Sequence, residues 1–112
     1  HGAAKRFENR VGGADLNPYL ALSAIIASGL HGVDHGLELE PALEGNAYAD
    51  ESHPRVPTTL AAARELFAES EAARAAFGDD VVAHYVNAAD VELRAFESAV
   101  TDWERIRGFE RL

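Results

Sequence analysis

The sequence lacks cysteine and methionine entirely and contains a single tryptophan. Without cysteine the chain forms neither disulfides nor thiolate metal sites, which is compatible with a reducing cytosol, so we expect a cytoplasmic protein. No signal peptide is visible. Because the chain begins at His1 and has no initiator methionine, we interpret it as a processed product or a piece of a longer protein.

Basic residues are also few, because 10 lysines and arginines stand against 19 acidic residues and the formal net charge is −9. Nucleic-acid binding needs a basic surface and membrane-surface binding needs a basic amphipathic helix, and the sequence offers neither. The most apolar run, Tyr19 to Leu30, is 12 residues long, whereas a membrane-spanning helix needs about 20. We therefore expect no nucleic acid and no membrane as partners.

Large apolar side chains are scarce for a chain of this size. A sequence of 112 residues forms one domain at most, with a small core. Alanine dominates the apolar content, and alanine favours helices but buries little area. We predict a marginal core built on leucine, valine, isoleucine and five phenylalanines, which fits a segment that packs on something else.

Local patterns predict one short strand followed by helices. Residues 5–11 alternate like a strand, and Asn17 followed by Pro18 is typical of a helix start. The irregular residues 33–57 form a loop long enough to be functional or mobile. Helices are expected over residues 18–31, 59–68, 71–77, 80–99 and 102–110, with caps at Asn17, Thr58 or Thr59, Ser70, Asp79 or Asp80, and Thr101.

The predicted strand carries an unusual row of charges. In a strand the side chains of Arg6, Glu8 and Arg10 share one face, opposite Phe7, Asn9 and Val11. Such a row is a poor core face, because buried charges are costly unless each is paired. It suits a site that handles phosphates, carboxylates and a metal ion, although a solvated strand face with mutual ion pairs would have the same pattern.

Residues 6–30, RFENRVGGADLNPYLALSAIIASGL, resemble the closing part of the catalytic domain of glutamine synthetases. That family has a strand R-x-E-x-R, a short turn, N-P-Y-L and an apolar helix. Later segments resemble the rest of the domain in order, so the resemblance covers essentially the whole chain. The wording of GGADLNPYLA and VTDWER is closer to the γ-glutamylpolyamine synthetase branch. The later segments are GLELEPALEGNAYADES, VPTTLAAARELFAES, FGDDVVAHYV and VTDWERIRGFERL.

The resemblance implies an α+β fold, in which residues 1–112 are a C-terminal fragment of the catalytic domain with one or two strands and a mostly helical remainder. It implies ATP-dependent ligation of glutamate to ammonia or a polyamine through a γ-glutamyl phosphate, with Mg²⁺ or Mn²⁺, in a ring-shaped homo-oligomer. We expect the fragment alone to be inactive, because the other acidic strands and the amine site lie outside it.

The same resemblance assigns roles to the charged row. Glu8 falls on a family position that binds a catalytic metal, and carboxylate oxygens suit Mg²⁺ or Mn²⁺. Arg6 falls on a position that contacts the ATP phosphates. Arg10 falls on a position that holds the glutamate γ-carboxylate or acyl phosphate, so we assign it both substrate-binding and catalytic roles, for which a planar guanidinium fork is well suited.

Three other interpretations remain open. His31 and His35 have the i, i+4 spacing of a helical zinc pair, but no third ligand is evident. Tyr48 lies in the loop where some bacterial glutamine synthetases carry an adenylylated tyrosine, although its surroundings depart from N-L-Y-D-L-P and a pinned loop aromatic is the simpler alternative. Finally, the chain could be a non-enzymatic acidic helical interaction module with a flexible N-terminal arm.

Overall fold

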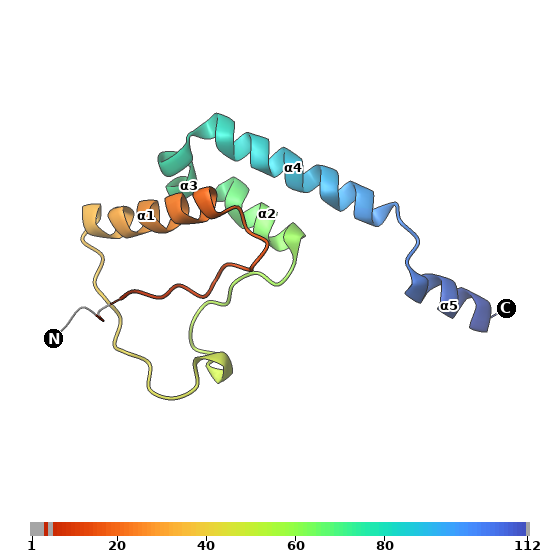
Figure 1. Cartoon of the computed structure of the whole chain (residues 1–112), viewed down its shortest axis with the longest axis horizontal. Helices are drawn as coiled ribbons and strands as arrows, with labels where there is room; N and C mark the ends of the chain where they lie inside the picture. Colours follow the sequence, from red (N-terminus) through yellow and green to blue (C-terminus); the bar gives the residue numbers. More distant parts are fainter. Residues whose placement is uncertain (1–3, 5, 112) are drawn as a thin grey trace. The chain divides into compact units, whose positions relative to one another are not determined.

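The computed structural model describes residue 4 and residues 6–111, which form helices joined by loops (Figure 1). The chain divides between Val56 and Pro57 into two compact units. Among the described residues only Val82 is fully buried, so the predicted marginal core is what the structure contains.

The first unit contains helix α1, which spans Pro18–Asp34. It begins as predicted, because the Asn17 side-chain oxygen accepts hydrogen bonds from the amides of Tyr19 and Leu20, at 3.0 and 3.3 Å. Pro18 occupies the first turn, where its missing N–H costs nothing. The helix start is thus determined by two adjacent residues.

Helix α1 ends three residues later than expected, because the glycine that stops it is Gly36. Its φ of +58° is the left-handed conformation that glycine adopts without steric cost. The Leu37 amide donates to the Gly32 carbonyl at 2.9 Å and the Gly36 amide to the Val33 carbonyl at 3.1 Å, the bonding of a Schellman motif. Gly32, which directly follows the predicted end at residue 31, therefore lies within the helix.

Replacing Asn17 by alanine should loosen the first turn of α1. The amides of Tyr19 and Leu20 lose their acceptor, and loss of an N-cap costs about 1 kcal/mol, or roughly fivefold faster amide exchange. Hydrogen exchange of α1 measures the effect. Asn17→Asp keeps the acceptor and serves as the matched control; equal exchange in both variants would contradict the capping role.

The strand predicted for residues 5–11 is absent from residues 6–11, so that prediction is wrong. The predicted α+β fold class, which depended on it, is also wrong. Residue 5 lies outside the described residues, and residues 6–11 carry no strand hydrogen bonds. A strand needs a neighbour to accept and donate backbone hydrogen bonds, and no second strand exists within the described chain. The described structure is therefore helical, with loops.

A long loop joins α1 to the second unit. Its only regular element in the described chain is the 3₁₀-helix η1, Ala47–Ala49. Asn46 caps η1 by accepting a hydrogen bond from the Tyr48 amide at 3.0 Å. The Tyr48 side chain is exposed, so it is not pinned against its neighbours as the simpler alternative supposed.

The second unit contains helices α2, α3, α4 and α5, which agree with the predicted ranges to within two residues at each end. Thr59 caps α2 and Ser70 caps α3 through side-chain oxygens. Thr101 and Glu104 form a full capping box at the start of α5, as their spacing predicted. The helices span Leu60–Glu69 (α2), Glu71–Phe77 (α3), Asp79–Glu97 (α4) and Asp102–Glu110 (α5).

Helices α2 and α3 both pack on α4 (Figure 1). Val82 of α4 is the one fully buried residue within the described part of this unit. Arg64 of α2 reaches across to Asp90 of α4, with two parallel N–H···O bonds of 2.9 and 3.0 Å. This pairing lowers the pKa of Asp90 and raises that of Arg64, because each charge stabilises the other.

Many large apolar side chains remain at the surface of each unit. Among the described helices, none has both the length and the hydrophobicity that crossing a membrane requires. The exposed large apolar residues of α1 recur every three or four positions, so they lie along one face of the helix. They are Tyr19, Leu22, Ile26, Leu30 and Val33.

Candidate active site

The three charged residues of the predicted row all lie in the loop before α1 and are exposed. The Arg10 Nε donates to the Glu8 Oε1 at 2.6 Å, and these side chains are 73% and 53% exposed. The two residues are two positions apart, so the chain brings them together locally. An exposed ion pair of this kind is weak, and both groups remain available to a ligand.

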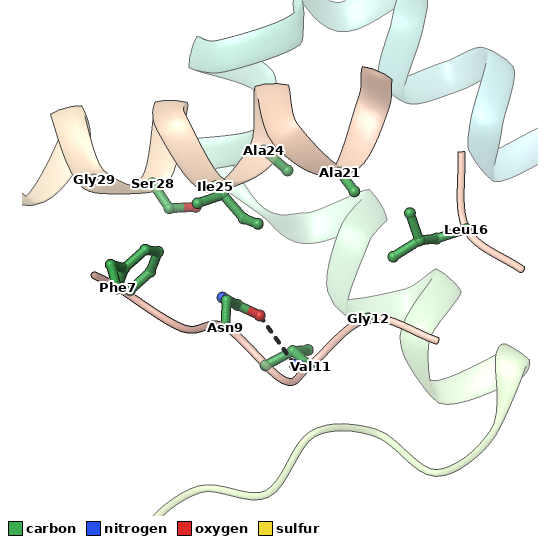
Figure 2. Close-up of a pocket in the computed structure, with 10 residues that line it drawn as sticks. All are labelled: Phe7, Asn9, Val11, Gly12, Leu16, Ala21, Ala24, Ile25, Ser28 and Gly29. Carbon is green, nitrogen blue, oxygen red and sulfur yellow. Dashed lines mark hydrogen bonds between the residues drawn. The ribbon is translucent and has the colours of Figure 1, made fainter. Parts of the chain in front are cut away.

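Intervening residues of the same segment face α1 instead. Figure 2 shows Phe7, Asn9 and Val11 on one side of a hollow of about 550 Å³, with α1 on the other. Neither Arg6, Glu8 nor Arg10 lines it. The alternation of side chains predicted for a strand is thus present without the strand. The hollow is lined by Phe7, Asn9, Val11, Gly12 and Leu16, and by Ala21, Ala24, Ile25, Ser28 and Gly29 of α1.

Two short-range contacts shape the segment after Arg10. The Asn9 side-chain oxygen accepts a hydrogen bond from the Val11 amide at 3.0 Å, a local turn that asparagine favours (Figure 2). Gly12 lies so close to the Leu16 side chain that a Cβ atom at this position would collide with it. A glycine there lets the chain turn back toward α1.

Glu8 can supply one oxygen ligand to a divalent cation. In the described part of the chain, no three histidine, aspartate or glutamate side chains gather closely enough to hold a metal ion. Mg²⁺ commonly takes only one or two protein carboxylates and completes its shell with phosphate oxygens and water. The exposed carboxylate of Glu8 fits that type of site, provided that other ligands come from outside these residues.

His31 and His35, the two histidines with zinc-like spacing, lie at the end of α1 and contact each other. Their rings are 4.0 Å apart between centroids, and His35 Nδ1 lies 2.8 Å from the His31 carbonyl oxygen. That contact occupies one ring nitrogen of His35. With no third ligand among the described residues, the pair has the contacts of a helix end and not those of a zinc site.

Comparison with known families decides the class of protein. Residues 1–107 match the model of the glutamine synthetase catalytic domain. The chain belongs to the glutamine synthetase catalytic-domain family. The family predicted from RFENR and NPYL is thereby confirmed. Because the expected strand is absent from the described residues, it is this match that favours the ligase interpretation over the interaction module.

Individual relatives of this glutamine synthetase family member are named as ligases. It is 58% identical to the gamma-glutamylethanolamide synthetase of Streptomyces coelicolor, over 100% of this chain and 24% of that protein. It is 40% identical to a glutamate–isopropylamine ligase of a Pseudomonas species, over 95% of this chain and 24% of that protein. It is 38% identical to the gamma-glutamylputrescine synthetase of Escherichia coli, over 88% of this chain and 21% of that protein. The chain thus spans about a quarter of the length of these relatives.

This glutamine synthetase family member contains a second polar cluster, which, unlike the charged row, was not predicted from the sequence. In the loop after α1, His53 lies between the carboxylates of Glu40 and Asp50. The only sequence signal is a lone histidine that follows Asp50 closely. Its distant partner Glu40, 13 positions earlier, could not be identified from spacing.

Proposed function

We propose that this chain is the C-terminal part of the catalytic domain of an ATP-dependent ligase that joins the side-chain carboxylate of glutamate to an amine. The family match over nearly all of the chain is the observation that carries the proposal. The relatives named above join glutamate to ethanolamine, isopropylamine or putrescine according to their names, which favours an organic amine over ammonia.

The proposed reaction proceeds in two balanced steps. A carboxylate oxygen of glutamate attacks the γ-phosphorus of ATP, and ADP leaves as the P–O bond to its β-phosphate breaks. The amine nitrogen then attacks the acyl carbon of the γ-glutamyl phosphate, inorganic phosphate leaves with the former carboxylate oxygen, and the nitrogen loses a proton. Both steps develop charge on phosphoryl oxygens, which enzymes stabilise with cations held in place.

Each residue of the charged row has a role in this proposal. Arg6 contacts the phosphates of ATP. Glu8 binds a divalent cation, Mg²⁺ or Mn²⁺, which neutralises charge on the transferring phosphoryl group when bound. Arg10 holds the glutamate γ-carboxylate and then the acyl phosphate through paired N–H donors. Their exposure supports these roles, because all three remain open to ligands in the described structure.

The experiment is a product assay on the intact protein. It is supplied with ATP, Mg²⁺, glutamate and one amine at a time: ammonia, ethanolamine, isopropylamine or putrescine. We expect ADP and a γ-glutamyl amide in equal amounts with at least one organic amine, detected by mass spectrometry. ADP release that does not depend on glutamate, or no amide with any of these amines, would contradict the proposal.

The isolated 112 residues should have no ligase activity. Glu8 is a single carboxylate, and the described residues hold no group that completes a metal site. A cation bound by one exposed carboxylate is not positioned for phosphoryl transfer. Glutamate-dependent ADP release by this segment alone would overturn the expectation.

Replacing Arg10 by lysine should impair the use of glutamate. Lysine keeps the charge but cannot form two parallel hydrogen bonds to a carboxylate, so we expect kcat/KM for glutamate to fall by about 10- to 100-fold. Steady-state kinetics with varied glutamate measure the effect. Arg55→Lys is the matched control, because Arg55 lies in the same unit outside the charged row; a similar loss in both variants would argue against a specific role for Arg10.

A further inference from the structure

The loop after α1 is closed by one polar contact between residues far apart in the sequence. The His53 Nε2 lies 3.1 Å from Glu40 Oε2 and joins the two ends of residues 41–52. Within residue 4 and residues 6–56, no other hydrogen bond or ion pair joins residues more than five positions apart. Among the polar contacts of these described residues, this pair is therefore the one that closes the loop.

The other ring nitrogen of His53 also faces a carboxylate. Nδ1 forms a short contact with Oδ2 of Asp50, at the end of η1. The Ser52 hydroxyl donates to Asp50 Oδ1 at 2.7 Å and lies 3.0 Å from the same ring nitrogen. Arg55 donates to the Asp50 backbone carbonyl at 3.3 Å. The Asp50 side chain is only 18% exposed, against 45% for His53 and 75% for Glu40.

We propose that the Glu40–His53 ion pair is a pH-operated switch, which holds the loop of residues 41–52 closed while both ring nitrogens of His53 carry protons and releases it when one proton is lost.

The arrangement of donors and acceptors explains the switch. Two carboxylate acceptors need two N–H donors, and only the imidazolium form of histidine provides both. On deprotonation the remaining proton stays on Nδ1, because Asp50 and Ser52 contact this nitrogen and lie within three residues of His53 in the sequence. Nε2 then presents a lone pair to the Glu40 carboxylate, which repels it, and the distant contact is lost.

The direction of the pH dependence follows from the pKa values of the two groups. The hydrogen bond from Ser52, together with that from His53, lowers the pKa of Asp50 to about 2, so this carboxylate stays charged in ordinary buffers. The hydrogen bond to Asp50, with the charges of Asp50 and Glu40, raises the pKa of His53 above its usual 6.5. A raised histidine pKa means that the contact is complete at low pH and is lost as pH rises through that value.

Hydrogen exchange of the intact protein tests the switch over a pH series that spans the titration of His53. After correction for the intrinsic effect of pH, amides in residues 41–52 should exchange about two- to fivefold faster at the alkaline end, the scale of an exposed ion pair. His53→Gln and Glu40→Ala should exchange at this faster rate throughout. Glu44→Ala is the matched control, because it removes the same charge from the same loop and should respond as the unmodified protein does.

Two results would overturn the proposal. The first is corrected exchange of residues 41–52 that does not change with pH in the unmodified protein. The second is an effect of Glu44→Ala equal to that of Glu40→Ala, since this would indicate a general effect of loop charge. The proposal does not depend on ligase activity, so its failure and that of the proposed function are separable.

Discussion

Replacing Glu8 by glutamine is expected to reduce ligase activity of the intact protein by about a hundredfold or more, the scale seen when a charge-stabilising group is removed from an active site. Glutamine has nearly the same shape as glutamate but lacks the negative charge that a hard divalent cation prefers. The variant should also bind Mn²⁺ more weakly. Kinetics with varied Mg²⁺ and electron paramagnetic resonance of bound Mn²⁺ measure the two effects.

Glu38→Gln is the matched control for this experiment, because Glu38 is an exposed carboxylate of the same unit outside the charged row. It should leave both activity and Mn²⁺ binding unchanged. The second readout matters because Glu8 also pairs with Arg10. A Glu8→Gln variant that loses activity but binds Mn²⁺ normally would contradict the metal role and point to the positioning of Arg10 instead.

The second large effect concerns stability and Val82. This side chain is 0% exposed, and no other residue described in the second unit is fully buried. Val82→Ala removes two buried methyl groups and leaves a cavity. We therefore expect the free energy of unfolding of α4 to fall by about 2–3 kcal/mol. Val82→Asp should cost more, because it buries a charge with no partner. Hydrogen exchange of the α4 amides reports both.

The neighbouring residue provides the control for Val82. Val81 lies on the same helix and is 37% exposed, so Val81→Ala makes the same chemical change at a partly solvated position. We expect it to cost less than about 1 kcal/mol. If the two alanine variants were equally stable, Val82 would not be the anchor of the α2, α3 and α4 packing.

Four of the five α-helix starts were predictable because their chemistry is local, whereas α4 begins after Gly78 without the side-chain cap expected at Asp79 or Asp80. Asn17, Thr59, Ser70 and Thr101 each cap the helix that follows through an atom two or three residues away. The end of α1 was less predictable, since Gly32 and Gly36 both look like stop signals. Only the backbone conformation, with its positive φ at Gly36, shows which glycine terminates the helix.

What sequence reasoning missed depends on residues far apart. The predicted strand needed a partner that the described chain does not contain, so alternation alone was insufficient evidence. The pairings of Arg64 with Asp90 and of Glu40 with His53 join residues 26 and 13 positions apart. No spacing rule predicts such contacts, because loop closure brings them together only in the folded chain.

The charged row was predicted from the sequence with two alternatives, a ligand-binding site and a solvated face with mutual ion pairs. Glu8 and Arg10 form the mutual ion pair that a solvated surface would show. The family match supports the alternative in which this row serves a ligase. The roles of Arg6, Glu8 and Arg10 therefore remain predictions that depend on the experiments above.

The most direct test of the account follows an oxygen atom. If the glutamate carboxylate attacks ATP and the amine then displaces phosphate, an oxygen of that carboxylate leaves with the phosphate. The intact protein is given glutamate labelled with oxygen-18 in its side-chain carboxylate, together with ATP, Mg²⁺ and an accepted amine. The account predicts labelled oxygen in the released phosphate, in step with amide formation. Amide formed with unlabelled phosphate would contradict a γ-glutamyl phosphate and the role proposed for Arg10.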